Sequence, residues 1–411
     1  MLRHYLTLSI KVLLRRKVFT VISLFGIVAT LTVFVVIAAL LDHSFGPGEP
    51  ERKRDRMLSV MRVNMFGEGL RMSAHGSYNL FNTAARKLPG VEYMSIFTNA
   101  ITADSFVDGR KQTLSLKRTD AGFWRVFDFT FIEGRPYETR DVENAEFVAV
   151  ITETTRQRLI GEAPAVGRTI EVDGQSFRVV GVVPDVSEMR ALPYSEVWVP
   201  VTTSKTSLND TGLLGGYQVA VIAQDRAALP GIREEFNSRL SRIEMPSGAQ
   251  TVVAPFETQF EGFARQMMSD ENPASKAPLL MGIMVACGLL LALLPAVNLV
   301  NLNVSRILER HSEIGVRKAF GASSRTLVGQ FVVENVLLTL VGAVIAFVVS
   351  AFVLQAINQS GMIAHAQLGL NGRIFLSGAA IALVFGVVSG VYPAWRMSRL
   401  HPVNALKGQS R

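Results

Sequence analysis

The sequence has a single cysteine and few charged residues. Cys287 is the only cysteine among 411 residues, so no disulfide bond within the chain can be argued. Charged residues make up only 18% of the chain and hydrophobic residues 49%, a balance that a purely soluble protein of this size does not normally show. The apolar residues are therefore expected to be concentrated in particular segments.

Sequence motifs of nucleotide, metal and nucleophile sites are missing as well. The chain contains no GxxxxGK[ST] phosphate loop, no CxxC, no HExxH and no GxSxG. Its six histidines are scattered, at positions 4, 43, 75, 311, 365 and 401. We therefore expect no catalytic residue, no metal site and no cofactor in this chain. An enzyme anchored to a membrane is accordingly the weakest functional hypothesis.

Four long stretches contain no Asp, Glu, Lys or Arg, and they begin at Val18, Ala277, Asn335 and Ile374. A transmembrane helix needs about 20 predominantly apolar residues, so each stretch is long enough to cross a bilayer. The third stretch ends at Gly372, and its polar end together with the next residue, 358–373, is expected to form a short external loop. The sequence therefore predicts four transmembrane helices, at 18–41, 277–305, 335–357 and 374–395. The absence of charge inside them argues against an ion-coupled carrier.

The distribution of charge along the chain predicts the orientation of these helices. The formal net charge of +8 divides into +5 for residues 1–17, +2 for 306–334, +4 for 396–411 and −3 for the remainder. Because Lys and Arg in short flanking segments favour the cytoplasmic side, the three basic segments and both chain termini are placed in the cytoplasm. The charge is thus a topology signal and not a sign of a nucleic-acid partner. Residues 1–17 are also expected to form an amphipathic helix on the membrane surface.

Residues 42–276 are then expected to form an extracytoplasmic domain of 235 residues. Near its start, a β-rich run over Leu58–Met65 precedes a helical segment, Tyr78–Leu88, and a second β-rich run. Near its end, Gln218–Ala223 precedes another helical segment and the short β-rich run Thr251–Ala254. We expect these two β-α-β units, from opposite ends of the domain, to share one sheet.

The middle of this domain, residues 112–200, is predicted to be an insert with a β-rich core of its own. Within it, two β-rich runs, Arg168–Val172 and Ser176–Val183, flank the dipeptide Asp173-Gly174. Such a dipeptide favours the positive φ values of a tight hairpin turn. A β-hairpin is therefore expected at this point.

The densest motif lies in the cytoplasmic segment 306–334. On a helix, Ile314 and Arg317 would contribute to a mixed apolar and basic surface, while Gly315 and Ala319 would offer a face of small residues. The following Gly-Ala-Ser is typical of a helix end followed by the cap of the next helix. A short helix between two membrane spans is expected to act as a docking element.

This motif carries a resemblance to a known family. Residues 313–322, EIGVRKAFGA, with Gln330, Phe331 and Glu334 downstream, resemble the signature of the MacB and FtsX-like permease family of ABC transporters. Further matching motifs occur in the same order, at Leu24–Ile27, Glu133–Pro136, Phe147–Ile151, Phe177–Asp185, Tyr392–Trp395 and Pro402–Lys407. The resemblance covers essentially the whole chain.

The resemblance implies a non-catalytic permease subunit of a type VII ABC transporter. It implies four transmembrane helices, and an α+β external domain with a porter-like split βαβ sheet and an inserted Sabre-like subdomain. It also implies a coupling helix that docks on an ATPase through Glu313, Ile314, Gly315, Val316, Arg317, Lys318, Ala319, Gly321 and Ala322. MacB carries its own nucleotide-binding domain, whereas this chain begins close to its first span, so ATP and Mg²⁺ are expected on a separate cytoplasmic ATPase dimer.

Two functions follow as hypotheses. In the first, the chain lies in the bacterial inner membrane and transmits ATP-driven motion to its periplasmic domain, driving the export or extrusion of a periplasmic or membrane-derived substrate. In the alternative, it acts as an FtsX-like regulator that activates an extracytoplasmic partner such as a cell-wall hydrolase. Expected partners are membrane lipid and a second permease, either another copy or a paralogue. Whether a periplasmic adaptor and an outer-membrane channel take part is left undecided, and so is the identity of the substrate.

Overall fold

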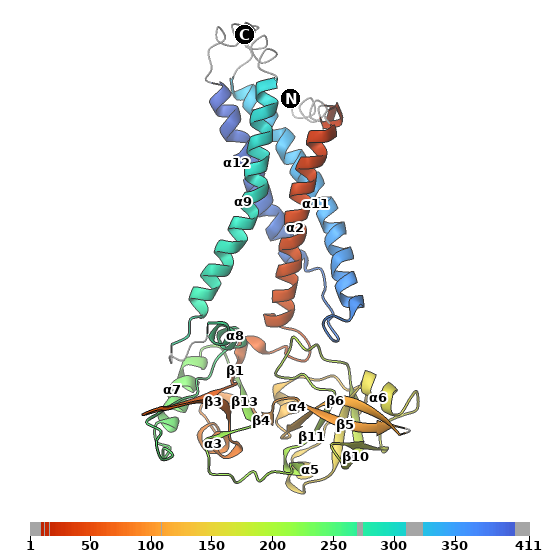
Figure 1. Cartoon of the computed structure of the whole chain (residues 1–411), viewed down its shortest axis with the longest axis vertical. Coiled ribbons are helices and arrows are strands. Elements are labelled where there is room, and N and C mark those ends of the chain that lie inside the picture. Colours follow the sequence, from red (N-terminus) through yellow and green to blue (C-terminus); the bar gives the residue numbers. More distant parts are fainter. Residues whose placement is uncertain are drawn as a thin grey trace. The chain divides into compact units, whose positions relative to one another are not determined.

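The computed structural model of the chain describes residues 10–11, 13–15, 17–107, 109–268, 274–309 and 324–398 (Figure 1). These residues divide into two compact units. The helical unit comprises Met1–Leu41, Met281–Ser360 and Leu368–Arg411, and the sheet unit comprises Asp42–Leu280 and Gly361–Gln367. The last residues of the first long helix and the loop 361–367 thus belong to the sheet unit.

Each of the four predicted membrane spans lies within one long helix. These helices are α2 (Lys17–Phe45), α9 (Ala277–Glu309), α11 (Ser324–Ser360) and α12 (Gly372–Ser398). Over the described residues, Lys17–Phe45 and Val332–Ser360 are long and apolar enough to cross a membrane, while Ala277–Leu291 and Gly372–Val388 form shorter apolar helical stretches. Length and composition therefore give two candidate membrane helices, and the count of four stays a prediction.

Glycines allow the helices of the helical unit to approach one another closely. A small apolar cluster on α2 and α11 contains Ile27, Leu31, Leu338, Ala343 and Ala346. A Cβ atom at Gly342 of α11 would lie 2.7 Å from Ile27 Cγ2, and one at Gly378 of α12 would lie 2.8 Å from Phe34 Cδ1. Small residues at helix crossings are a common packing device in membranes, where no hydrophobic force drives helices together.

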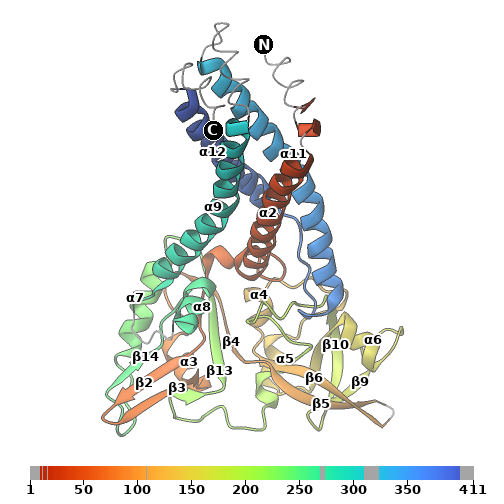
Figure 2. The same cartoon turned by 45° about the horizontal axis from the view of Figure 1, so that its top comes forward.

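The sheet unit contains a mixed sheet of 14 strands (Figure 2). In chain order, the strands are β1 (Met57–Val60), β2 (Val63–Gly67), β3 (Leu70–Gly76), β4 (Val91–Thr98), β5 (Ile101–Val107), β6 (Arg110–Thr119), β7 (Glu133–Gly134), β8 (Val148–Thr152), β9 (Thr169–Val172), β10 (Gln175–Val183), β11 (Val197–Pro200), β12 (Leu214–Gly215), β13 (Tyr217–Ala223) and β14 (Thr251–Val253). The spatial order is β14-β2-β3-β13-β4-β6-β11-β8-β10-β7.

Short helices connect these strands. They are α3 (Tyr78–Ala84), α4 (Phe123–Val126), α5 (Thr139–Glu143), α6 (Glu153–Leu159), α7 (Leu229–Leu240) and α8 (Gln259–Met267), together with the 3₁₀ turns η1 (Arg54–Arg56) and η2 (Val201–Thr203). In α7, Ile232, Phe236 and Leu240 recur every fourth residue and are all buried, as an amphipathic helix requires. Helix α8 begins with a capping box in which Thr258 and Glu261 bond each other's backbone N–H groups.

The two ends of the domain share one sheet, as the sequence predicts. Strand β13 is completely buried and runs antiparallel to both β1 and β4, so β1 and β4 are parallel to each other and α3 lies in their connection. Strand β14 follows α7 and pairs with β2. The single β-rich run expected over Leu58–Met65 is instead divided between β1 and β2, and β3 pairs with β2 in a hairpin whose turn contains Gly69 at φ 70°.

The strands of residues 112–200 continue the same sheet. Strand β6 is parallel to β11, β8 is antiparallel to β11, and β10 is parallel to β8. The predicted hairpin is confirmed: β9 and β10 are antiparallel, and Asp173 and Gly174 between them have φ values of 55° and 66°. The boundaries of the insert stay a prediction.

Candidate functional site

The predicted docking residues lie outside the described part of the chain. Helix α9 is described to Glu309 and α11 begins at Ser324, so residues 313–322, including Glu313 and Arg317, fall between them. Downstream, Gln330 and Glu334 of the same motif lie one turn apart on α11 and are 9% and 2% exposed. Both make polar interactions within the protein. The motif therefore continues into a buried polar face at the start of α11.

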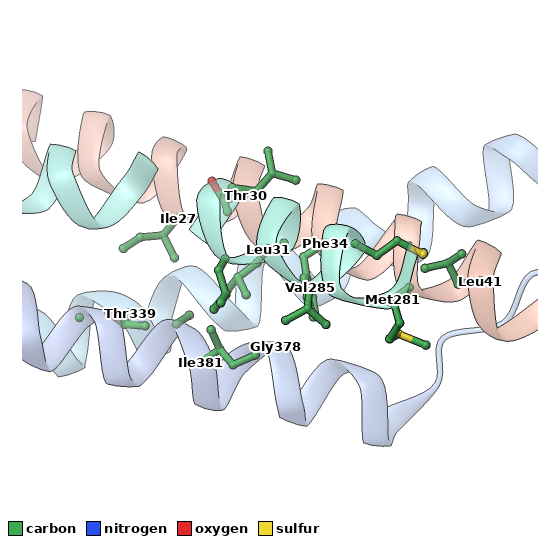
Figure 3. Close-up of a pocket in the computed structure, with 17 residues that line it drawn as sticks. Ile27, Thr30, Leu31, Phe34, Leu41, Met281, Val285, Thr339, Gly378 and Ile381 are labelled. Carbon is green, nitrogen blue, oxygen red and sulfur yellow. The ribbon is translucent and has the colours of Figure 1, made fainter. Parts of the chain in front are cut away.

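A cavity of about 360 Å³ lies between the helices of the helical unit (Figure 3). It is lined by residues of α2, α9, α11 and α12, and the side chains of Leu31, Val285 and Ile381 are among those that face it. No lining residue carries a charge, and only Thr30 and Thr339 have polar side chains. Thr339 Oγ1 already donates to the carbonyl oxygen of Asn335 at 2.9 Å. The cavity lining is therefore poorly suited to an ion or a polar substrate.

A second cavity, of about 510 Å³, lies in the sheet unit and has a polar lining. Asn64 of β2 and Gln218 of β13 line it and are 7% and 3% exposed. His75 Nδ1 lies 2.6 Å from a backbone carbonyl oxygen, so Nδ1 carries the proton of that hydrogen bond. Arg265 Nη2 and Nε donate hydrogen bonds to Glu257 Oε1 at 2.6 and 2.9 Å, so these two opposite charges offset each other. The remaining lining includes amide and imidazole groups and the guanidinium of Arg62, which bonds to Ser73, so the cavity suits hydrogen bonding to a polar molecule.

An unusual group of charged side chains is buried in the sheet unit. Glu51 is completely buried, and its Oε2 lies 3.1 Å from Arg190 Nη1 and also accepts a hydrogen bond from Arg54. These three residues form the Glu51 cluster. Arg54 and Arg190 are only 7% and 5% exposed. Sequence reasoning missed this cluster because Arg190 is far from Glu51 and Arg54 in the chain and each of the three would be expected at the surface.

Lys117 of β6 lies nearby and is also completely buried. Its Nζ donates to the carbonyl oxygens of Ala191, at 3.2 Å, and Leu192. Burial lowers the pKa of Lys117 to about 7, and the negative charge of Glu51 opposes this shift only in part. Among the described residues, no group of three or more His, Cys, Asp or Glu side chains could hold a metal ion.

Two family models match the chain. The MacB-like periplasmic core domain matches residues 20–239, and the FtsX-like permease C-terminal domain matches residues 284–402. The chain belongs to the MacB and FtsX-like family of ABC transporter permeases. The family resemblance expected from the sequence is thereby confirmed, as is the large external domain of mixed α and β structure. Members of this family are inner-membrane permeases that serve as components of transporters.

Curated relatives of this permease are export proteins. The macrolide export ATP-binding/permease protein MacB of Bdellovibrio bacteriovorus is 25% identical over 281 residues, which are 68% of this chain and 41% of that protein. The pyoverdine export ATP-binding/permease protein PvdT of Pseudomonas fluorescens is 26% identical over 291 residues, which are 71% of this chain and 42% of the relative. The permease thus spans about two fifths of the length of these relatives.

Solved structures with similarity to this permease come from external domains. The periplasmic region of MacB from Actinobacillus actinomycetemcomitans is 16% identical with a TM-score of 0.37, and the match covers 53% of this chain and 94% of that one. The extracellular domain of the transporter YknZ from Gram-positive bacteria is 14% identical with a TM-score of 0.37, and the match covers 47% of this chain and 98% of that one.

Proposed function

We propose that this permease transmits ATP-driven motion across the inner membrane to its external domain and so drives export. In this proposal α2, α9, α11 and α12 all cross the membrane, and both termini lie in the cytoplasm. A separate cytoplasmic ATPase dimer holds ATP and Mg²⁺. When the ATPase closes, the helices move, and the sheet unit moves with them to expel a substrate that is already outside the membrane.

The observation that carries this proposal is the apolar character of the cavity between the helices. A carrier that passes a polar substrate through the bilayer needs polar or charged groups along its path. None of the 17 residues that line this cavity carries a charge, and one of its two hydroxyl groups is committed to the backbone. Transmission of movement requires no polar path through the membrane, so it suits these helices better than conduction.

The sequence motif at residues 313–322 supplies the proposed docking surface. The motif carries Glu313, Arg317 and Lys318, and these side chains can form ion pairs across an interface with a soluble partner. We propose that Glu313, Arg317 and their neighbours bind the ATPase dimer. The names of the relatives, which describe macrolide and pyoverdine export, favour export over the regulatory alternative.

The test is a measurement of ATP turnover by the ATPase with and without this permease in lipid membranes. We expect the permease to stimulate turnover, and Glu313→Ala and Arg317→Ala to abolish both the stimulation and co-purification of the ATPase. The matched control is Arg373→Ala, which removes an exposed arginine at the start of α12. Unchanged stimulation by the Glu313 and Arg317 variants would overturn the assignment of this segment. Stimulation of a cell-wall hydrolase without export would favour the regulatory alternative.

A further inference from the structure

The β-ladder between the two halves of the sheet is short. The first half-sheet contains β1–β4 and β12–β14, and the second half-sheet contains β5–β11. Strands β4 and β6 connect them through a single register pair, Phe97 with Thr119, whereas β4 and β13 pair over seven positions. The halves are otherwise joined mainly by side chains, including a shared apolar cluster that contains Phe97 and Trp198. Apolar packing is non-directional, so it allows a change of angle between the halves more readily than a long ladder does.

The C-terminal end of α2 is held by the Glu51 cluster. Residues 42–45 of α2 belong to the sheet unit. Arg54 donates to the carbonyl oxygens of Ser44 and of Gly46, and Arg190 Nη2 lies 3.5 Å from Gly46 O. Cationic side chains at a helix C-terminus satisfy its free carbonyl groups and interact favourably with the helix dipole. Glu51 supplies the counter-charge for both guanidinium groups.

The β10–β11 loop, residues 184–196, connects this helix end to the second half-sheet. Arg190 is part of the loop, and the next two residues of the loop, Ala191 and Leu192, accept the hydrogen bonds of the buried Lys117 on β6. At its far end, Trp198 Nε1 of β11 donates to Pro193 O at 3.2 Å. A displacement of Arg190 is therefore passed directly to β6 and β11.

The same loop also contacts the segment between α11 and α12. The backbone N–H of Glu188 donates to Ala364 O at 3.3 Å, and Asp185 Oδ1 lies 3.9 Å from His365 Nδ1. Asp185 is itself held by the hydroxyl of Thr154 at 2.8 Å. The β10–β11 loop therefore contacts both the segment that follows α2 and the segment between α11 and α12.

The contact of α2 with the first half-sheet is of a different kind. Phe45 packs against Phe260 and Phe263 of α8, with ring centroids 5.4 and 5.1 Å apart. Contacts between aromatic rings tolerate a range of geometries, whereas a buried ion pair loses much of its energy when its partners separate. The end of α2 is therefore connected to the loop through directional polar contacts, by way of Arg54, Glu51 and Arg190, and to α8 through aromatic packing.

We infer that the β10–β11 loop is the element through which movement of α2 and of the α11–α12 segment reaches the second half-sheet, with Glu51 and Arg190 as positioning residues. The inference rests on the proposed transmission of motion. A buried ionic cluster is a poor source of stability compared with apolar packing, but it fixes one geometry.

The experiment uses the full-length permease with its ATPase in lipid membranes. In a Cys287→Ser background, Glu68→Cys and Arg110→Cys place one spin label on each half-sheet at exposed positions. The distance between the labels is measured with and without ATP. Two variants then disturb the loop: Glu51→Gln removes the counter-charge, and Gly48→Ala places a Cβ 2.5 Å from Arg190 Nη2. The second variant requires only the end of a flexible side chain to move, so folding is expected to be retained.

We expect ATP to change the distance in the wild type, and both variants to lose this change while the stimulation of ATP turnover is retained. The matched control is Arg118→Gln, which breaks the largely buried ion pair with Asp173, 2.9 Å long, elsewhere in the second half-sheet, and should keep the change. If both variants show the same change of distance as the wild type, the role of the loop is overturned and the proposed function stands. The same holds if Arg118→Gln also loses the change. The absence of any change in the wild type would overturn the proposed function itself.

Discussion

Replacement of Lys117 by methionine should remove a specific dependence of stability on pH. Lys117 is completely buried, and its ammonium group has two carbonyl oxygens as hydrogen-bond partners and no carboxylate within hydrogen-bond distance among the described residues. Burial lowers its pKa from the ordinary value of 10.5 to about 7. Between these two values the unfolded chain binds a proton at Lys117 that the folded protein releases.

The sign and size of the effect follow from this difference in proton binding. Because the unfolded state binds more protons, the free energy of unfolding rises with pH, by up to about 1.4 kcal/mol per pH unit. Between pH 7 and pH 9 the contribution of Lys117 should amount to about 2 kcal/mol of added stability. Well below pH 7, Lys117 is protonated in both the folded and the unfolded state, so its contribution to the free energy of unfolding no longer changes with pH. The folded protein then bears the full free-energy cost of burying this charge.

The assay is urea unfolding of the full-length permease in detergent at pH 6, 7, 8 and 9, followed by tryptophan fluorescence. Trp124 and Trp198 are buried in the sheet unit and report on its unfolding. The difference in unfolding free energy between wild type and Lys117→Met should change by about 2 kcal/mol between pH 7 and 9. The control Lys111→Met removes a lysine that is 58% exposed and should leave the slope unchanged. Equal slopes for wild type and Lys117→Met would refute the reasoning.

Two further changes test the structure of the sheet unit. Glu257→Ala removes a largely buried carboxylate that accepts hydrogen bonds from Arg265 at 2.6 and 2.9 Å, so we expect a loss of about 1.5 to 3 kcal/mol in urea unfolding at pH 7; a loss below about 0.5 kcal/mol would show that the pair contributes little to stability. Gly174→Val forces a β-branched residue to a φ of 66° in the β9–β10 turn and should cost at least about 1 to 2 kcal/mol, whereas Gly174→Asn, which tolerates this conformation, should cost less; equal losses would contradict the turn geometry.

Local features of the fold could be predicted because the signal for each lies within a short segment. The uncharged stretches beginning at Val18 and Asn335 predict helices, since an apolar segment of that length has no other way to satisfy its backbone in a bilayer. Asp173-Gly174 predicts a hairpin, since few other residues adopt two successive positive φ values. The docking role of residues 313–322 stays a prediction, because these residues lie outside the described part of the chain.

The buried charged groups could not be predicted. Lys117 follows Leu116 in a strand whose residues face alternate sides, so the pattern suggests an exposed position. It is buried because β11 pairs with β6 and brings the β10–β11 loop over it. Glu51 and Arg190 are separated by 139 residues, and no local pattern relates them. Their pairing depends on the order of the strands in the sheet, which no local sequence pattern predicts.

The sequence by itself determined the apolar helices, the mixed α and β character of the external domain, and the family of the chain. Each of these follows from composition, periodicity or a contiguous motif, which act over a few residues to a few tens of residues. Only the tertiary structure decided that β13 inserts between β1 and β4, that the ladder between the half-sheets has one residue pair, and that Glu51 pairs with Arg190 of the β10–β11 loop. These contacts link distant segments, so they are selected by the burial and pairing of the whole chain at once.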